Sequence, residues 1–216
     1  LKLKNNHYLN LFVLLSFGQK KKVFEGDTLY TYDGQHVMPH EGFIDQGLFD
    51  DSLKDGKWIS SDDQSRLIFE IINGVRHGTF YYEYVGLNEI AWKIEFSNGQ
   101  KSGTWKRYNV RKNSNVLTSI PFKNGKVNGK VVHYYSDGSI NSTQEFKQGL
   151  MHGRYIGYFE NGDTMWDGQY VDDKEHGVFL HYSKDEKKPY KKEFYKNGVL
   201  EDTIYLEWYN KFRKKN

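Results

Sequence analysis

The sequence contains no cysteine and only three prolines in 216 residues. The absence of cysteine excludes disulfide bonds, thiol catalysis and cysteine-ligated metal sites. With so few prolines, the chain does not have the composition of a proline-rich disordered segment. Beyond residue 20 it also has few long runs of leucine, isoleucine and valine, which argues against a thick globular core.

A large excess of charge of either sign is also absent. The formal net charge of +3 falls to +1 when Lys2 and Lys4, which lie in a predicted leader, are set aside. Domains that bind nucleic acid usually carry a strongly basic surface. The sequence therefore gives no electrostatic support for a nucleic-acid partner.

Glycine and aromatic residues are abundant instead. The chain has 21 glycines, and aromatic residues make up 17% of it, whereas apolar residues as a whole reach 37%. Broad aromatic side chains can stack on one another across neighbouring strands. This composition favours thin sheets over a thick core.

The strongest pattern is an internal repeat. Each copy has an aromatic residue, a turn pair, a second glycine four positions after that pair, and then a short aromatic strand. The copies in residues 146–158 and 170–182 match at every one of these positions without an insertion or deletion. The second-glycine position recurs at residues 56, 78, 103, 129, 153, 177 and 202, where Asp202 replaces glycine. A fixed period of this length indicates a repeat architecture.

Each repeat predicts one β-hairpin. A strand such as residues 130–135 leads into a pair such as Asp137-Gly138 or Asn161-Gly162, which tolerates the positive φ of a tight turn. We expect the segment between the two glycines to link one hairpin to the next. The predicted fold is all-β: an elongated single antiparallel sheet of tandem hairpins, with about 24–25 residues per repeat, within the range of known repeat architectures. The structural turn glycines predicted in this way are Gly74, Gly78, Gly99, Gly103, Gly125, Gly129, Gly149, Gly153 and Gly177.

Aromatic residues recur two and five positions after the second glycine, and neighbouring hairpins should stack them in ladders. On a regular strand these two positions face opposite sides. Either a bulge redirects one of them, or both faces of the sheet are partly covered. The repeat-frame residues that are also candidates for contact with a partner are Phe80, Tyr82, Trp105, Tyr108, Tyr134, Tyr155, Tyr158, Phe179 and Tyr182.

The segment 1–18 has the three parts of a secretory signal peptide. Lys2 and Lys4 precede an apolar run, and the small residues Ser16 and Gly18 precede Gln19. The run, about nine residues long, is too short to span a bilayer, which requires roughly 20 residues. The alternative is a buried N-terminal element of the fold. We expect an exported protein, in the periplasm, at the cell surface or outside a bacterium.

The predicted organisation has four segments. We expect a signal peptide at residues 1–18 and irregular or capping strands at residues 19–54. The tandem repeats occupy residues 55–205, and a basic C-terminal tail occupies residues 206–216. The tail could contact anionic lipid or cell-wall polymer, but a solvated C-terminus is the simpler interpretation.

The repeat also resembles a known family. Residues 122–138, which contain Asn124-Gly125, Asn128-Gly129 and Asp137-Gly138, are similar to the bacterial variant of the MORN repeat. Residues 146–162 and 96–108 are similar to it as well, and the resemblance covers about residues 55–205. Bacterial proteins built in this way resemble the YwqK family of toxin–antitoxin antitoxins.

That resemblance implies a non-enzymatic binding protein made of an extended antiparallel sheet, with a protein partner that could be a toxin. It carries no catalytic set, because the repeated residues are glycines and aromatics. MORN-type repeats are also associated with membrane phospholipids and with protein scaffolding. A glycan- or phospholipid-binding scaffold of the cell envelope is therefore the alternative function.

Three histidines, His77, His152 and His176, precede the second glycine of their repeats. Equivalent positions two strands apart are separated by roughly 10 Å, too far to share one zinc ion. Ser102 and Asn128 take the same position, so only a small polar residue is required there.

The sequence gives weaker indications of other metal-binding or catalytic residues. His36 and His40 have helical metal-ligand spacing, but Pro39 argues against a helix. Neighbouring carboxylates would point to opposite faces of a strand, so they indicate solvated turns. These pairs are Asp50-Asp51, Asp62-Asp63 and Asp172-Asp173. We predict no catalytic residue, no cofactor and no metal; the partner is a protein, or else a glycan or lipid.

Overall fold

A computed structural model describes residues 19–24, 27–32, 55–61, 65–84, 86–110 and 114–213. The chain divides into two compact units, which we call the N-terminal unit (residues 1–100) and the C-terminal unit (residues 101–216) and describe separately. The division falls inside the predicted repeat segment, 55–205. The predicted signal peptide, the His36–His40 pair and the carboxylates at 50–51 and 62–63 lie outside the described residues.

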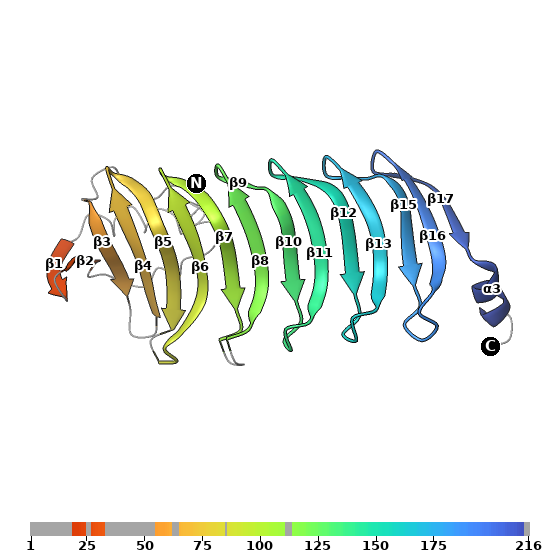
Figure 1. Cartoon of the computed structure of the whole chain (residues 1–216), viewed down its shortest axis with the longest axis horizontal. Coiled ribbons are helices and arrows are strands. Elements are labelled where there is room, and N and C mark those ends of the chain that lie inside the picture. The colour runs from red at the N-terminus through yellow and green to blue at the C-terminus, as the bar shows by residue number, and fades with distance from the viewer. Residues whose placement is uncertain are drawn as a thin grey trace, which may run out of the picture. The chain divides into compact units, whose positions relative to one another are not determined.

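The N-terminal unit is a sheet of short strands (Figure 1). Its strands are β1 (Gln19–Phe24), β2 (Asp27–Tyr32), β3 (Gly56–Ser61), β4 (Ser65–Ile72), β5 (Val75–Tyr84) and β6 (Glu89–Ser97). Strands β3 to β6 pair antiparallel in chain order, β1 pairs antiparallel with β2, and β2 pairs parallel with β3. The strand expected at residues 29–32 is part of β2.

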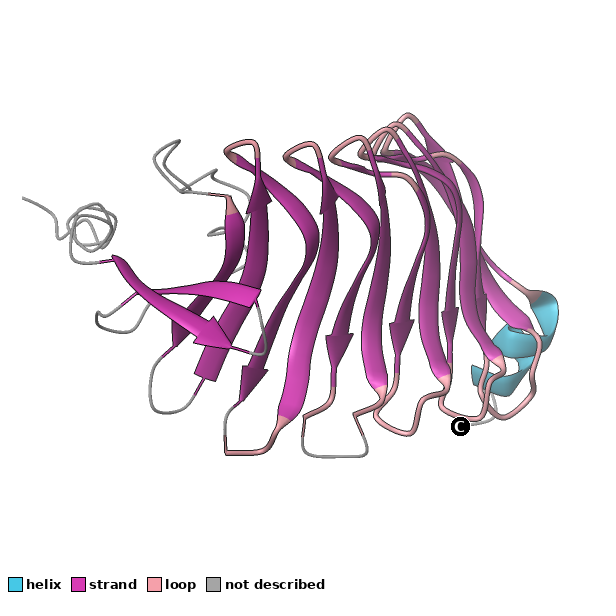
Figure 2. Cartoon of the chain, turned by 60° about the vertical axis from the view of Figure 1, so that its left-hand side comes forward, coloured by secondary structure: helices cyan, strands magenta, loops and turns pink. Residues whose placement is uncertain are grey.

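The C-terminal unit continues the same pattern (Figures 1 and 2). Its strands are β7 (Gln100–Tyr108), β8 (Val116–Lys123), β9 (Lys126–Val127), β10 (Gly129–Tyr134), β11 (Ile140–Lys147), β12 (Leu150–Tyr158), β13 (Thr164–Val171), β14 (Lys174–Glu175), β15 (Gly177–Tyr182), β16 (Pro189–Lys196) and β17 (Val199–Tyr205). All their described pairings are antiparallel. The prediction of an all-β fold of tandem antiparallel hairpins is confirmed.

A short helix, α3 (Glu207–Arg213), follows the last strand and occupies most of the predicted basic tail. The indole of Trp208 donates a hydrogen bond to the Pro189 carbonyl at 2.8 Å, and the Tyr209 ring lies 4.9 Å from that of Tyr190. These contacts attach the helix to the first two residues of β16. Within the described residues, no helix has the length and hydropathy to cross a membrane.

The first glycine of each repeat lies in a two-residue turn between paired strands. In the turn from β8 to β9, Asn124 and Gly125 have φ of 52° and 75°, and Lys123 pairs with Lys126. Two positive φ values define a type I′ turn, which twists as the flanking strands do and favours Asn-Gly. Gly74, Gly99 and Gly149 lie in equivalent turns, and the pair Asp172-Asp173 forms another.

These turns are joined to one another by a row of backbone hydrogen bonds, which we call the turn ladder. In the C-terminal unit, the N–H of one turn bonds to a carbonyl just after the preceding turn, at 2.8–3.0 Å. The pairs are Gly125 to Lys101, Gly149 to Val127, Asp173 to Met151 and Gly198 to Glu175. Gly99 bonds to Arg76 in the same way within the N-terminal unit. Backbone hydrogen bonds therefore join successive repeats at their turns as well as along their strands.

The second glycines do not lie in turns, contrary to the expectation. Gly78, Gly103 and Gly153 lie inside strands, and Gly129 and Gly177 begin strands. All five have positive φ. In β12 three residues, 152–154, face the single residue Glu145 of β11, so Gly153 sits in a bulge. The backbone there needs a φ that glycine adopts easily, and the segment between the two glycines is itself part of a hairpin.

Aromatic side chains stack across the strands in ladders, as the repeat predicts. In the N-terminal unit Phe80 is 0% exposed, and its ring lies 5.2 Å from Phe69 and 4.6 Å from Phe96. In the C-terminal unit the ladder runs through Tyr155, Tyr170, Phe179 and Tyr195, with consecutive ring centres 5.9, 5.7 and 5.2 Å apart. The rings form the core of each sheet.

The strand register shows whether a bulge redirects one of the aromatic residues two and five positions after the second glycine, or whether these residues face opposite sides of the sheet. Gly157 pairs with Trp166 and Tyr158 with Thr164, so the extra residue of this bulge is Met165, on the facing strand. The hairpins that begin with β5, β7, β10 and β15 have the same one-residue register shift. In each, the shift lies between the fourth and fifth residues after the second glycine. The strand that carries Tyr155 and Tyr158 stays regular, so these side chains face opposite sides. Both faces are partly covered.

Candidate functional site: the aromatic face of the C-terminal unit

One face of the C-terminal unit carries a row of large aromatic side chains on neighbouring strands, and we call it the aromatic face. Cross-strand pairing places its residues side by side: Tyr155 faces Gly168, Trp166 faces Gly157 and His181, and Phe179 faces Glu193. Its principal residues are Trp105, Tyr155, Trp166, Tyr170, Phe179, His181, Lys191, Glu193 and Tyr195. The most extensive contacts among described elements of this unit join neighbouring strands. The Tyr209 ring of α3 packs against Tyr190, which lies beside His181.

Two glycines within the strands make room for the largest rings. Gly168 is buried, and a Cβ atom placed on it would overlap the Phe179 ring. Gly157 is also buried, and a Cβ atom there would overlap the Trp166 indole. Each ring therefore lies flat against backbone, which fixes its orientation on the face.

The Trp166 indole has an unsatisfied polar group. Its Nε1 atom is shielded from solvent and has no hydrogen-bond partner, although the residue as a whole is half-buried. An indole N–H is a donor that normally finds an acceptor when it is buried. The Trp166 N–H is thus a buried donor without an acceptor among the described residues, beside the ladder of rings.

A charged cluster borders the ladder. Glu193 accepts a hydrogen bond from Lys191 Nζ at 2.8 Å, and its other oxygen lies 2.6 Å from His181 Nε2. All three side chains are at most 25% exposed. Burial raises the pKa of Glu193, but the hydrogen bonds from Lys191 and His181 outweigh it, and the pKa lies below its usual value. The carboxylate therefore stays charged, next to the aromatic ladder.

Tyr170 should titrate well above an ordinary tyrosine. Burial, the nearby charge of Glu175 and a hydrogen bond of 3.3 Å to that carboxylate raise the pKa of Tyr170 to about 12. An unfolded tyrosine ionises near pH 10, so the contribution of Tyr170 to stability is full below pH ~10 and is lost as the pH rises towards 12. Tyrosinate absorbance of the wild type minus that of Tyr170→Phe should titrate near 12. A difference titrating near 10 would contradict this environment.

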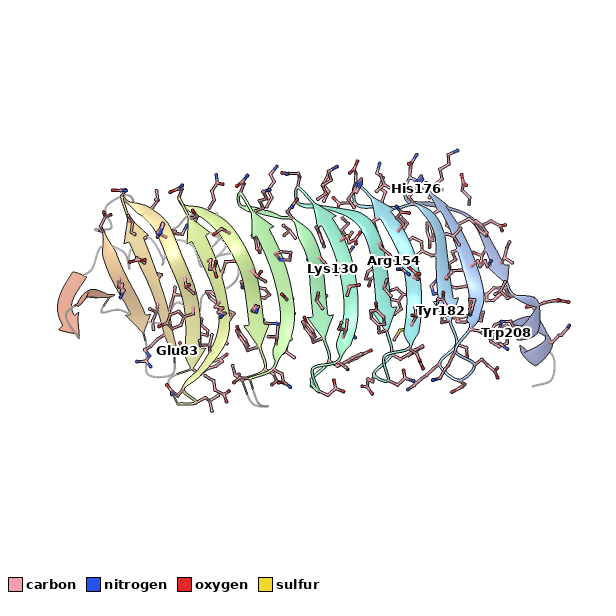
Figure 3. All side chains as sticks on the ribbon, viewed as in Figure 1. Glu83, Lys130, Arg154, His176, Tyr182 and Trp208 are labelled. Atoms are coloured by element: carbon pink, nitrogen blue, oxygen red, sulfur yellow. The ribbon has the colours of Figure 1, made fainter. Side chains whose placement is uncertain are left out.

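The predicted partner-facing residues separate into three groups. Phe80, Tyr82 and Phe179 are at most 7% exposed and belong to the cores of their sheets. Trp105 and Tyr155 are half-buried on the aromatic face. By strand alternation, the opposite face carries Tyr108, Tyr134, Tyr158 and Tyr182, all half-buried. Figure 3 shows Tyr182 at the end of β15 remote from His176, which immediately precedes that strand.

The opposite face is more highly charged. Arg154 binds Asp167 through two hydrogen bonds, of 2.8 and 2.6 Å, and this contact raises the pKa of the guanidinium above its usual value. A shallow pocket of about 370 Å³ beside this pair is also lined by Glu145, Val178 and Leu180. Because the two charges of Arg154 and Asp167 satisfy each other, the pair is best explained as a cross-strand support of the sheet.

Among the described residues, one histidine lies close to a hydroxyl group. His133 Nδ1 lies 3.3 Å from the Thr118 hydroxyl, and burial together with the charge of Arg107 lowers the pKa of this histidine. Among the hydrogen bonds of the described residues, none brings a carboxylate to His133 to complete a triad. Across the same residues no three metal-binding side chains gather. The nearest acidic contact of His152 is Asp172, at 3.1 Å.

Comparison with known proteins adds no family to this picture. No family model matches the chain, and no curated protein matches it.

Sequence reasoning missed several residues of the aromatic face. Trp166, His181, Lys191 and Glu193 lie outside the repeated frame, and only the strand register brings them together. A partial signal was present in Gly157 and Gly168, because glycine inside a strand often marks a close approach by another group.

Proposed function

We propose that the chain is a non-catalytic, exported repeat protein whose aromatic face binds a protein partner. The observation that supports this most directly is the row of half-buried aromatic rings on one face, among them Tyr155, Trp166 and Tyr170. Tyrosine and tryptophan are enriched at interface hot spots because they combine large, rigid contact area with a polar tip.

The resemblance to bacterial MORN-type repeats and to YwqK-family antitoxins supports the same proposal. It suggests a partner of the toxin type, met in the cell envelope or outside the cell. The C-terminal unit suits such a role, since its most extensive contacts join neighbouring strands of one sheet and Trp105, Tyr155 and Tyr170 remain only half-buried.

Binding should depend on the indole ring. Trp166→Phe keeps a ring over Gly157 but reduces the rigid contact area on the face, and we expect it to weaken capture of the partner by about 3–10-fold, the usual range for truncating an interface aromatic. The measurement is quantitative pull-down from the native cell envelope with immobilised full-length chain. Tyr182→Phe, on the opposite face, is the matched control. Recovery of no specific protein, or equal effects of the two variants, would count against the proposal.

A glycan or phospholipid of the envelope is the second candidate ligand. The observation that favours it is the position of the charged cluster, Lys191 and Glu193, beside aromatic rings on which a sugar could stack. Binding of the pure chain to envelope polysaccharide or to liposomes, weakened by Trp166→Phe and without any protein partner, would favour this candidate over the first.

A further inference from the structure

Three lysines project from two adjacent turns of the C-terminal unit, and we call them the lysine edge: Lys123, Lys126 and Lys147. All three are exposed. Lys123 and Lys126 stand directly opposite each other across the turn from β8 to β9. Lys147 precedes the next turn, and the Cβ of Lys126 is only 4.0 Å from the position that a Cβ on Gly149 would take. The turn ladder therefore brings three amino groups to one border of the sheet.

This positive charge has no ionic partner among the described residues. The ion pairs of this unit involve other lysines, such as Lys187 with Asp163 at 3.1 Å and Lys188 with Glu186 at 3.3 Å. Like charges placed directly opposite each other across two strands are destabilising. The fold thus tolerates an unfavourable pair, Lys123 and Lys126, which a bound anion would relieve.

The nearest acidic turn does not neutralise the lysine edge. In the following turn, Asp173 accepts a hydrogen bond of 2.7 Å from the Met151 N–H, and Asp172 lies 3.1 Å from His152. Met151 and His152 follow the turn that carries Lys147, so the two carboxylates border the lysine edge on that side. Beyond them, the exposed Lys174 and Lys196 take equivalent positions beside the next turn.

An exposed apolar side chain lies along the lysine edge. Leu150 is 42% exposed and pairs directly with Lys147 across the turn. A phosphate polymer could neutralise the lysines but has no apolar group to cover Leu150. An acidic polypeptide supplies both kinds of group. In an extended chain, alternate side chains lie on one face roughly 7 Å apart, so successive carboxylates on that face can approach successive lysines of the edge.

We propose that the lysine edge binds an acidic, partly apolar extended segment of the protein partner. This inference rests on the proposed function, because it describes the chemistry of that partner. Charges at the border of an interface chiefly accelerate association and select among partners. The aromatic face would supply the anchoring contacts, and the lysine edge would orient the partner along the turns.

The test uses the full-length chain and three probes: a fluorescent synthetic peptide rich in glutamate and containing leucine, linear polyphosphate, and vesicles of anionic phospholipid. K123Q/K126Q/K147Q should weaken peptide binding at least tenfold, and binding should fall as salt rises. The matched control is K184Q/K187Q/K188Q, at the opposite end of the strands, which should bind as the wild type does. Leu150→Asn should weaken peptide binding several-fold and leave polyphosphate binding unchanged.

The outcomes separate this inference from the proposed function. Absence of peptide binding at low salt, equal losses in the two triple variants, or tighter binding of polyphosphate or vesicles with no effect of Leu150→Asn would each overturn it. If the peptide does not bind but Trp166→Phe still weakens partner capture, the lysine-edge inference fails and the proposed function stands. Circular dichroism and thermal unfolding verify that each variant is folded.

Discussion

Replacing Phe179 with alanine is expected to lower the free energy of unfolding of the C-terminal unit by about 3–5 kcal/mol, the usual loss for a buried phenylalanine. The ring is 7% exposed and lies between Tyr170 and Tyr195, 5.7 and 5.2 Å away. Gly168 leaves no side chain that could move into the resulting cavity. Urea unfolding followed by tryptophan fluorescence measures the change.

The neighbouring residue provides the control. Val178 precedes Phe179 on the same strand, is 43% exposed and faces the other side of the sheet, so Val178→Ala should change stability by less than about 0.5 kcal/mol. In a repeat array the loss at Phe179 should concentrate in the repeats next to it. Equal stabilities of the two variants would show that the aromatic ladder is not the core of this unit.

Gly168→Ala is expected to have the second largest effect, a loss of about 1–3 kcal/mol. The backbone at Gly168 has no positive φ that would strain an alanine, but the new methyl group would overlap the buried Phe179 ring. The cause is therefore overpacking alone. Thermal unfolding of the purified variant gives the size of the loss.

Two further variants isolate that cause. Gly86→Ala adds a methyl group where nothing lies within 4 Å, so it should be neutral or slightly stabilising. Adding Phe179→Leu to Gly168→Ala removes the overlapping ring atoms, so the double variant should lose less stability than the sum of the single changes. Strict additivity of the two changes would argue against contact between these residues.

The repeated frame was predictable from sequence because it depends on local chemistry. Pairs such as Asn124-Gly125 specify a two-residue turn wherever they separate two strand-like segments, and the regular return of Phe122 and Phe146 marks the strand before each turn. These features gave the all-β hairpin fold. The position of Gly153 was misjudged, because a glycine with positive φ suits a bulge as well as a turn, and only the pairing partner distinguishes them.

The aromatic face was less accessible to sequence reasoning. That Trp166 packs over Gly157, or that Glu193 meets both Lys191 and His181, depends on which residues oppose each other across strands. A bulge with its extra residue at Met165 changes that register by one position. Shifts of this kind are properties of two strands together, so one strand's sequence does not reveal them. Trp208 was missed for a related reason: its indole bonds to the distant Pro189 carbonyl.

The turn ladder has a consequence for how such a gene can change. Each of its bonds in the C-terminal unit, such as Gly149 to Val127, reaches only to the preceding turn, and every strand there pairs with strands close to it in sequence. Unequal recombination that adds or removes one whole repeat would recreate an equivalent junction, with the same turn and the same bond. Natural selection can therefore lengthen or shorten the sheet by whole repeats while each repeat keeps the same fold.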